Sequence, residues 1–325
     1  MTTETRSRVL VTGGAGFIGS HLAEGLLAAG NEVRVLDDLS SGKEENLARI
    51  SGDVEFVLGD VRDGAAVDFC LEGVDAVFHL AGLASVPMSR EDPGLCLSVN
   101  GRGTLNVLDS AAKHKVKRLV YASTSAVYGD LPAPHDDESP APKPDTPYAA
   151  VKYLGENLAL FYKQDRKLDT VVLRYFNVYG PRQSADGPDS GVIPLFMEAH
   201  LNGESPVVHG DGTQTRDFVH VGDVVSATMS AGFSKKASGV YNVSSGEPVS
   251  INRLLETFAR LFPGNPLPPR FVPARPGDPP ASLGTTARAE RDLSFRASIS
   301  LEEGLRDLKS DFERRRDPGP VARDR

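Results

Sequence analysis

Cysteine is scarce in this sequence: Cys70 and Cys96 are the only two in 325 residues. Their spacing matches no metal-ligand motif, so we expect no metal site, and so few thiols are typical of a reduced, cytoplasmic protein. The first residues lack the apolar stretch of a signal peptide, and no segment has the roughly 18 consecutive apolar residues of a membrane helix. We therefore expect no membrane partner.

Positive charge is also in short supply. The chain has 36 Lys and Arg against 44 Asp and Glu, which gives a net charge of -8. This balance argues against a nucleic-acid partner, because such surfaces are usually basic. The length suits one large domain or two closely joined domains with a sizeable core.

Short apolar runs alternate with segments of helical period. Because each crossover between parallel strands needs a returning helix, this order predicts an α/β fold, a doubly wound parallel sheet. Strand-type runs occupy residues 8–14, 32–38, 54–61, 75–82, 118–124 and 169–180, and helical segments occupy 20–30, 100–115 and 148–164. The proline-rich stretch 130–147 is expected to be an ordered loop.

A glycine-rich turn follows the first of these runs, in "VLVTGGAGFIGSH". Glycines at this junction let backbone N–H groups and a helix N-terminus approach a pyrophosphate. Asp37 ends the next predicted strand, 18 residues after Gly19. A carboxylate there accepts hydrogen bonds from ribose hydroxyls and repels a 2′-phosphate, so the pattern favours NAD over NADP.

A wider set of motifs resembles the extended short-chain dehydrogenase/reductases, in the nucleotide-sugar epimerase and dehydratase group, over nearly the whole chain. The closest resemblance is to UDP-glucose and UDP-N-acetylglucosamine 4-epimerases. The matching stretches are "TGGAGFIGSH", "DDLSSG", "GDVRD", "HLAG", "VNGRGTLNVL", "YAAVK", "RYFNVYGPRQ", "GDGTQTRDFVHVGD" and "ARPGD".

The resemblance implies a Rossmann domain that binds NAD. Asp60 and Val61 would lie at the adenine, Leu80 to Gly82 would line the nicotinamide-side ribose, and Asn100 would lie behind the catalytic residues. His79 is interpreted as a packed residue at a strand end. The full implied cofactor set is Gly13, Gly16, Phe17, Ile18, Gly19, Asp37, Asp38, Ser41, Gly42, Asp60, Val61, Leu80, Ala81, Gly82, Asn100 and Lys152.

Tyr148 and Lys152 are four residues apart in "YAAVK", on one face of a predicted helix. A free tyrosine, with a pKa of about 10, is a poor base at neutral pH. A nearby lysine and the positive nicotinamide ring both favour the phenolate. By resemblance, Thr124 hydrogen-bonds the reacting sugar hydroxyl, while Ser123 and Ser125 are interpreted as ordinary hydroxyls at the strand end.

No carboxylate follows Thr124, since the next two residues are Ser125 and Ala126. Dehydratases and many decarboxylases of the group carry acidic residues there, because they need a second general acid or base. Epimerisation at C4 needs no such group. The sequence therefore predicts a C4 epimerase that regenerates its NAD in each cycle.

The substrate end is assigned by resemblance. Asn177 and Arg216 would hold the diphosphate, and Arg275 and Asp278 would meet a phosphate and the uridine ribose, in line with the bidentate donors of arginine. A small residue at Ser282 would leave room for an N-acetyl group on C2. The full implied substrate set is Ser85, Thr124, Tyr148, Asn177, Val192, Arg216, Arg275, Asp278 and Ser282.

The domain expectation has two parts. Residues 1–177 would form the NAD-binding domain, with a returning segment at about 214–243. Residues 178–213 and 244–312 would form a smaller mixed α/β substrate domain, and 313–325 a disordered tail. A homodimer is implied by resemblance, through helices at about 101–115 and 149–164.

Three alternatives stay open. A UDP-glucuronate 4-epimerase would use the same catalytic trio and could hold its carboxylate with hydroxyls at Ser85, Ser89 and Thr124. A nucleotide-sugar dehydratase is disfavoured by Ser125 and Ala126. A non-catalytic NAD-binding scaffold is disfavoured because Tyr148 and Lys152 are both present.

Overall fold

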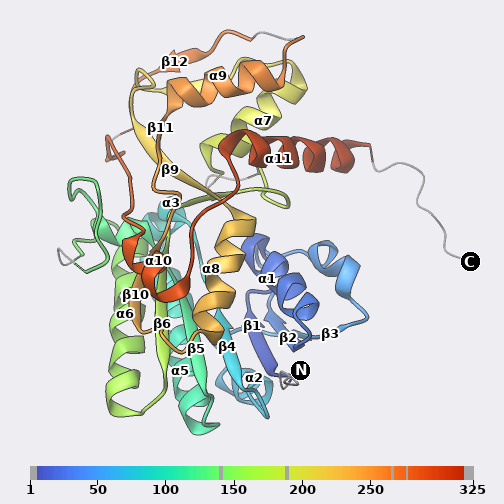
Figure 1. Ribbon diagram of the computed structural model, residues 1–325, viewed down its shortest axis with the longest axis vertical. Helices are drawn as coiled ribbons and strands as arrows, with labels where there is room; N and C mark the ends of the chain where they lie inside the picture. Colours follow the sequence, from blue (N-terminus) through green and yellow to red (C-terminus); the bar gives the residue numbers. More distant parts are fainter. Residues whose placement is uncertain (1–5, 139–141, 187–189, 265–266, 276, 318–325) are drawn as a thin grey trace, which may run out of the picture.

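The computed structural model describes residues 6–138, 142–186, 190–264, 267–275 and 277–317. Figure 1 shows a large domain of strands between helices, with a smaller domain above it. The described part of the chain contains no helix that is both long and apolar enough to cross a bilayer. Cys70 and Cys96 are buried free thiols.

The large domain is built on a seven-stranded parallel sheet of order β10-β6-β5-β4-β1-β2-β3, which confirms the predicted α/β fold. Successive residues of β1 face opposite sides, so that Val9 and Val11 enter one core and Leu10 the other. Burial on both faces explains why the central strands read as continuous apolar runs, whereas the edge strand Val54–Leu58 is partly exposed. The strands are β1 (Arg8–Thr12), β2 (Glu32–Asp37), β3 (Val54–Leu58), β4 (Ala76–His79), β5 (Arg118–Thr124), β6 (Thr170–Tyr175) and β10 (Gly239–Val243).

Helices cover both faces of this sheet. On one face α1 (Phe17–Ala28) packs beside α8 (Val221–Phe233). On the other face lie α2 (Gly64–Cys70), α5 (Thr104–Lys113) and α6 (Pro147–Asp165), which share the second core with the strands. The strand order reverses between β1 and its neighbours β2 and β4, the place where such sheets bind ligands.

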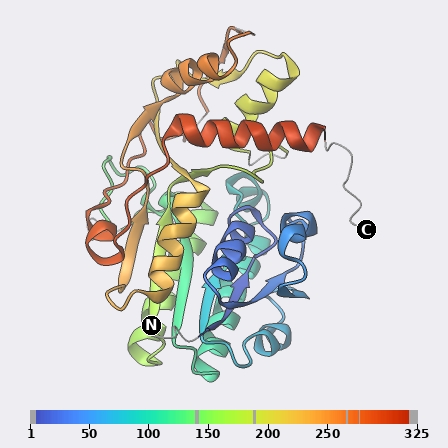
Figure 2. The ribbon, with the colours of Figure 1, turned by 45° about the vertical axis from the view of Figure 1, so that its right-hand side comes forward.

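The smaller domain has its own core and two short sheets. One sheet joins β7 (Asn177–Tyr179), β9 (Thr215–His220) and β11 (Pro248–Ser250), and the other joins β8 (Val207–His209) and β12 (Arg270–Val272). Its helices are α7 (Val192–Asn202), α9 (Ile251–Leu261) and α11 (Leu301–Arg316). Figure 2 shows α11 lying across the molecule above α1 and α8.

The chain passes between the domains more often than the expected boundaries suggest. Within the expected returning segment, β9 pairs with β7 and β11 in the smaller domain, whereas α8 and β10 lie in the large one. A further helix, α10 (Ala287–Leu293), packs on β10 and α8. The tail expectation needs correction at its start, because α11 continues to Arg316 with a capping box at Ser300. Residues 318–325 lie outside the described residues.

Short helices connect the strands near the carboxyl edge of the large sheet. The predicted helix at 100–115 is a π-helix followed by an α-helix, and such π segments are frequent at functional sites. These short elements are η1 (Glu44–Ile50), α3 (Val86–Glu91), α4 (Pro93–Cys96), η2 (Leu97–Gly103) and η3 (Ser125–Tyr128).

Candidate active site

The residues expected to bind the cofactor gather along the carboxyl edge of the large sheet. The glycine turn follows β1, Asp37 ends β2, Asp60 follows β3, and the 80–82 segment follows β4. These strands are neighbours in the order β4-β1-β2-β3, so the four segments form one continuous rim. The lower domain in Figure 1 presents this rim to the smaller domain above it.

The glycine turn leaves the start of α1 open. Gly13 has a φ of +71°, and a Cβ there would come within 2.7 Å of the Ala81 nitrogen. Within the described residues no side chain caps α1 at Gly16, and Phe17, Ile18 and Gly19 bring no carboxylate to its first turn. Uncapped N–H groups at a helix N-terminus attract an anion, so this turn fits a pyrophosphate.

Asp37 lies beside that turn. Its carboxylate is buried and accepts hydrogen bonds from the Ala15 nitrogen at 2.9 Å and the Leu39 nitrogen at 2.9 Å. Burial raises the pKa of Asp37, and these two backbone hydrogen bonds oppose the rise. The Gly42 Cα lies close enough that a Cβ there would come within 2.8 Å of the carboxylate. The arrangement holds the carboxylate in a fixed position beside the glycine turn.

The remaining residues of the rim differ in their surroundings. Asp38 and Ser41 are exposed. The Asp60 carboxylate accepts a hydrogen bond from Arg62 Nε at 2.7 Å, and this contact lowers the pKa of Asp60. Val61 is buried beneath the rim and Asn106 Nδ2 donates to its carbonyl at 2.9 Å.

Asn100 fixes the backbone that follows β4. It belongs to the π-helix η2 and is 1% exposed. Its side chain accepts from the Leu83 nitrogen at 2.8 Å and donates to the Leu83 carbonyl at 2.9 Å. At Gly82 a Cβ would meet Asn100 Oδ1 at 2.8 Å and Lys152 Nζ at 4.0 Å. Gly82 thus lies between the Asn100 side chain and the end of Lys152.

His79 is enclosed in the sheet. Its Nδ1 is 2.7 Å from Thr12 Oγ1 and its Nε2 is 3.0 Å from Thr104 Oγ1. Burial lowers the pKa of His79 to about 3, so the ring is neutral at physiological pH. The packed interpretation of this histidine is confirmed.

Tyr148 and Lys152 project from the first turns of α6. Thr146 caps this helix, and the Tyr148 nitrogen donates to Ser89 Oγ at 3.1 Å. Burial raises the pKa of Tyr148 to about 12, while the neighbouring Thr124 side chain acts in the opposite direction. The phenol therefore needs a nearby cation to lose its proton near neutral pH.

Lys152 lies one helical turn beyond Tyr148 on α6. Its side chain is buried, with Nζ 4.5 Å from the centre of the Tyr121 ring. Burial lowers the pKa of Lys152 to about 8, and the charge of Glu156 acts in the opposite direction. The ammonium form thus still predominates at neutral pH.

Thr124 ends β5 next to this pair. Its Oγ1 accepts a hydrogen bond from the Ala126 nitrogen at 3.2 Å at the start of η3, and the same side chain lies beside the Tyr148 phenol. Ser123 donates instead to Glu156 Oε1, further along α6. The structure thus brings Thr124, Tyr148 and Lys152 together and gives Ser123 a different partner.

The residues expected at the diphosphate meet around β9. Arg216 Nη2 donates to Asp278 Oδ1 at 2.6 Å, and Asn177 Nδ2 donates to the Asp217 carbonyl at 3.2 Å. Arg275 is exposed, and its carbonyl accepts from the Asp278 nitrogen at 3.2 Å. The arrangement concentrates two arginines and one amide at the edge of the smaller domain.

Three further predicted substrate residues are held by local contacts. Ser282 is 8% exposed, and its nitrogen donates to the Thr215 carbonyl at 3.1 Å. Ser85 is buried and caps α3 by accepting from the Met88 nitrogen at 2.9 Å. Val192 begins α7 and packs against the core of the smaller domain.

Two buried acids at this site were missed in the sequence. Asp217 accepts hydrogen bonds from Ser245, Gly246 and Gly284, which lies two residues beyond Ser282. Glu156 accepts from Ser123 and Arg174. Their places in the sequence could have identified them, because Asp217 follows Arg216 directly and Glu156 is one helical turn beyond Lys152.

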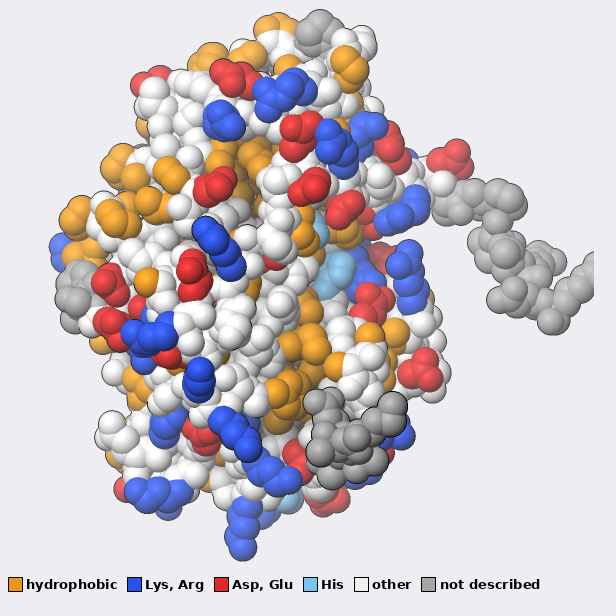
Figure 3. All heavy atoms as spheres, viewed as in Figure 1, with side chains coloured by type: hydrophobic (Ala, Val, Ile, Leu, Met, Phe, Trp, Pro, Cys, Tyr) orange, Lys and Arg blue, Asp and Glu red, His pale blue; other side chains and the backbone are white. Residues whose placement is uncertain are grey.

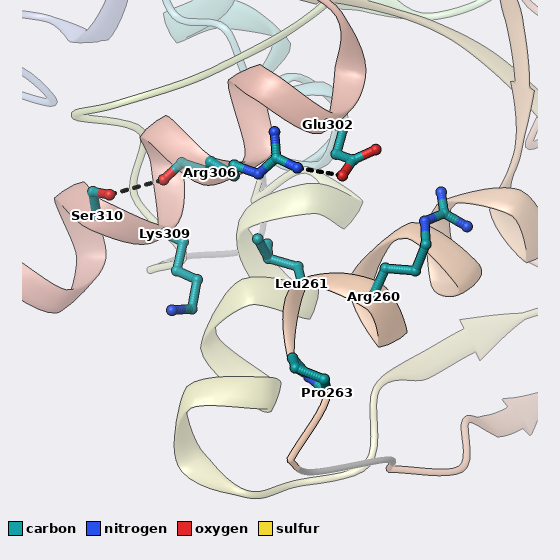
Figure 4. A pocket seen from close by; sticks show the side chains of 7 residues that line it. All are labelled: Arg260, Leu261, Pro263, Glu302, Arg306, Lys309 and Ser310. Atoms are coloured by element: carbon teal, nitrogen blue, oxygen red, sulfur yellow. Dashed lines mark hydrogen bonds and ion pairs between the residues drawn. The ribbon is translucent and has the colours of Figure 1, made fainter.

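Other surface features lie apart from this site. A cavity of about 430 Å³ between α9 and α11 contains none of the predicted site residues. Figure 4 shows its lining by Arg260, Leu261, Pro263, Glu302, Arg306, Lys309 and Ser310. Acidic and basic side chains are intermixed over the face drawn in Figure 3. Across the described residues, no cluster of three or more His, Cys, Asp or Glu could hold a metal ion.

Comparisons with known proteins agree with this geometry. The model of the NAD dependent epimerase/dehydratase family matches residues 9–244. A UDP-glucose 4-epimerase of Mycolicibacterium smegmatis is 39% identical over 302 residues, covering 92% of this chain and 96% of the relative. A dTDP-glucose 4,6-dehydratase of Streptomyces niveus is 36% identical over 309 residues, which cover 92% of this chain and 90% of the relative.

Solved structures give the same result. A UDP-N-acetylglucosamine 4-epimerase from Methanobrevibacter ruminantium, in complex with UDP-N-acetylmuramic acid, has a TM-score of 0.91 at 38% identity and covers 95% of this chain and 99% of its own. A UDP-glucose 4-epimerase of Thermus thermophilus in complex with NAD has a TM-score of 0.85 at 39% identity. The match covers 94% of this chain and 99% of the Thermus chain. The resemblance of the motifs is thereby confirmed, and the chain belongs to the NAD-dependent epimerase/dehydratase family.

Proposed function

We propose that this protein catalyses the NAD-dependent C4 epimerisation of a UDP-hexose through a transient 4-keto sugar. One observation carries the proposal: Tyr148 and Lys152 on α6 meet Thr124 at the end of β5, and no acid occupies positions 125 and 126. The site can move one proton at C4 but has no second acid there to remove or add another.

The cofactor site fits NAD on the features of its rim. The open start of α1 would take the pyrophosphate, and the buried Asp37 would take the adenosine ribose. The 80–82 segment, held by Asn100, would lie along the nicotinamide side. Bound NAD supplies the hydride acceptor and donor for C4 of the sugar.

The protein side of the reaction is a proton transfer at the C4 hydroxyl. Tyr148 would take this proton as C4 is oxidised and return it after the keto sugar has turned over. Lys152 would stabilise the phenolate, because its ammonium form predominates at neutral pH. Thr124 would hold the same hydroxyl in line with the phenol.

We assign the diphosphate to Arg216 and Asn177, with Arg275 and Asp278 nearby toward the phosphate and uridine ribose. Arg216 is partnered by Asp278 in the present structure, and its planar guanidinium has further donors for phosphate oxygens. A small, buried Ser282 leaves space for an N-acetyl group. The similar archaeal structure is named a UDP-N-acetylglucosamine 4-epimerase, which supports N-acetylhexosamines as substrates.

The UDP-glucuronate alternative relies on three hydroxyls, of which the structure uses one elsewhere. Ser89 is fully buried, donates to the Val86 carbonyl at 2.7 Å and accepts from the Tyr148 nitrogen. Ser85 and Thr124 accept from backbone nitrogens, and a hydroxyl that accepts can still donate its own proton. The loss of Ser89 favours UDP-hexoses without a carboxylate, and the assay below separates the two substrates.

We also infer a homodimer in the cytoplasm. The outer faces of η2 and α6 carry large exposed apolar side chains: Leu97 is 52% exposed, Leu154 42% and Phe161 54%. Such side chains on adjacent helices are suited to an interface between copies. The buried free thiols of Cys70 and Cys96 suit a reducing compartment.

The test is an assay of the purified protein without added NAD, against UDP-GlcNAc, UDP-glucose and UDP-glucuronate, with the C4 epimers resolved by NMR. We expect the GalNAc or galactose epimer to form, and the Tyr148→Phe variant to be at least about 100-fold slower. Turnover of UDP-glucuronate alone would change the substrate and keep the mechanism. A stable 4-keto product, or no turnover even with NAD supplied, would contradict the proposal.

A further inference from the structure

Glu156 is a buried acid on the same face of α6 as Tyr148 and Lys152. The three residues are spaced by four, so their side chains lie along one side of the helix. The Glu156 side chain is 1% exposed. A carboxylate this deeply buried is unfavourable unless other groups compensate its charge.

Two neighbouring strands supply that compensation. Ser123 on β5 donates to Glu156 Oε1 at 2.5 Å. Arg174 on β6 donates to Oε2 through Nη2 at 2.7 Å and to Oε1 through Nε at 3.0 Å. Because Ser123 immediately precedes Thr124, the carboxylate ties the end of β5 to the helix that carries Tyr148 and Lys152.

Arg174 is itself held from its other side. Its Nη1 donates to the Tyr128 hydroxyl at 3.0 Å, and that hydroxyl donates to Asn242 Oδ1 at 2.7 Å. The guanidinium also lies over the Tyr128 ring, 4.9 Å from its centre. The position of Glu156 is therefore set by a hydrogen-bonded cluster that spans β5, β6 and β10.

The helix is seated closely against β5 at this point. A Cβ at Gly155 would lie 2.2 Å from the Tyr121 hydroxyl, so there is room only for glycine. The same Tyr121 ring faces Lys152 Nζ. A shift of α6 at Glu156 would thus move Lys152 relative to the aromatic ring that it faces.

Several titratable groups surround Lys152. From its own helix come Tyr148 and Glu156, from β4 His79, from β5 Tyr121, and from α4 Cys96. Burial keeps His79 neutral and raises the pKa values of Cys96, Tyr121 and Tyr148. The negative charge in this set belongs to Glu156, which also forms a salt bridge with Arg174 on β6.

We propose that Glu156, held by Ser123 and Arg174, is a positioning residue that keeps the Lys152 ammonium charged and in place beside Tyr148. The proposal rests on the proposed function of the Tyr148 and Lys152 pair. Glu156 acts through Lys152 and not on the sugar. Loss of its charge therefore changes the ionisation of Lys152 and leaves substrate affinity nearly as it was.

The test measures the pKa of Lys152 in the NAD-saturated protein, from the 13Cε chemical shift of labelled lysine assigned with Lys152→Met. Glu156→Gln keeps the shape of the side chain and removes its charge. We expect the pKa of Lys152 to fall by about one unit. The high-pH limb of the kcat profile should move by the same amount, with KM changed less than about twofold.

In Glu156→Gln the buried Arg174 loses the carboxylate that compensates its charge, and this loss could prevent folding. A second variant avoids the problem. Glu156→Gln with Arg174→Met removes both charges, and the pKa of Lys152 should still fall, by less than in the single variant. Asp223→Asn is the matched control: Asp223 is also buried, holds the backbone at Ser298 and Ile299, and lies on α8. It should leave the pKa of Lys152 unchanged.

An unchanged pKa of Lys152 in a folded Glu156 variant would overturn the proposal and reduce Glu156 to a structural role. An equal fall in the pKa of Lys152 in Asp223→Asn would also overturn the proposal, because the effect would then not be specific to Glu156. A protein without epimerase activity would contradict the proposed function alone, because the NMR titration reports on Lys152 without turnover.

Discussion

Ser282 occupies a buried position beside β9, two residues before Gly284, whose backbone is held by Asp217. In the proposed site, a small side chain at this position would leave room for a substituent on C2 of the sugar. The size of the residue should therefore decide which C2 substituents are accepted, because a pocket rejects what it cannot hold.

We predict that Ser282→Tyr lowers kcat/KM for UDP-GlcNAc at least about 10-fold and changes the value for UDP-glucose by less than about threefold. Ser282→Ala is the control and should keep both activities. The measurement is steady-state kinetics on the two substrates. An equal loss on both would show that the tyrosine acts on folding and not on selectivity.

His79 predicts a pH dependence of stability. Below pH 6.5 the unfolded chain binds a proton at this histidine, whereas the folded protein does not until about pH 3. The unfolded state therefore gains protons as the pH falls, and the free energy of unfolding decreases across this window. Above pH 6.5 both states are neutral at His79 and the effect disappears.

We predict that His79 alone lowers the free energy of unfolding by about 2 kcal/mol between pH 7 and pH 5. Urea unfolding of the wild-type protein and of His79→Gln, each at both pH values, measures this contribution as the difference between the two losses. Equal losses in the two proteins would mean that His79 is accessible to protons in the folded state.

The turn between β1 and α1 shows how one element serves both folding and binding. At Gly19 an added Cβ would lie 2.1 Å from the Gly13 carbonyl oxygen, so the protein itself needs glycine there. At Gly16 the backbone φ of -74° suits any residue, and a Cβ would lie 3.2 Å from the same oxygen. Gly16 is thus needed mainly for the approach of a ligand.

We predict that Gly16→Ala weakens NAD binding at least about 10-fold and lowers Tm by no more than about 2 °C. Gly19→Ala should lower both the affinity for NAD and Tm, because its added Cβ would clash with the protein itself. Calorimetric titration with NAD and thermal unfolding measure the two effects. A large fall in Tm for Gly16→Ala would assign this glycine to folding.

Sequence patterns predicted the elements that depend on local periodicity. The strands β1, β2, β4, β5 and β6 and the helices α1 and α6 follow from apolar runs and caps, since strands buried on both faces leave a strong signal. The pattern at 100–115 predicts one ordinary helix, whereas the structure has the π-helix η2 before α5, and Asn100 in η2 contacts Leu83, 17 residues earlier in the chain. Tertiary contacts of this kind leave no trace in local spacing.

The candidate site also combines features that local sequence predicts with features that depend on tertiary contacts. Thr124, Tyr148 and Lys152 could be placed together from motifs, and the structure does bring them together. The use of Ser85 as a helix cap and the burial of Glu156 between two strands could not be foreseen. A charged residue usually lies at the surface, and only the position of Arg174 on the neighbouring strand reveals why this one does not.

At the scale of the whole molecule, the exposed apolar side chains on α6 test the inferred homodimer. We predict that Leu154→Glu combined with Phe161→Glu converts the protein to monomers, because two charges would be buried in the interface. Light scattering coupled to size-exclusion chromatography measures the mass. Phe233→Glu is the control, since Phe233 is 45% exposed on α8 and should leave the mass unchanged. A mass unaffected by the double substitution would place any interface elsewhere.

The repeated passage of the chain between its two domains has a consequence for how such proteins can diverge. After β6 the chain enters the smaller domain, returns for α8 and β10, leaves again for β11 and returns once more at α10. No single cut in the gene separates one domain from the other. Exchange of the smaller domain by recombination would therefore have to replace several separate segments at once, so substitutions within the existing chain are the simpler route to divergence.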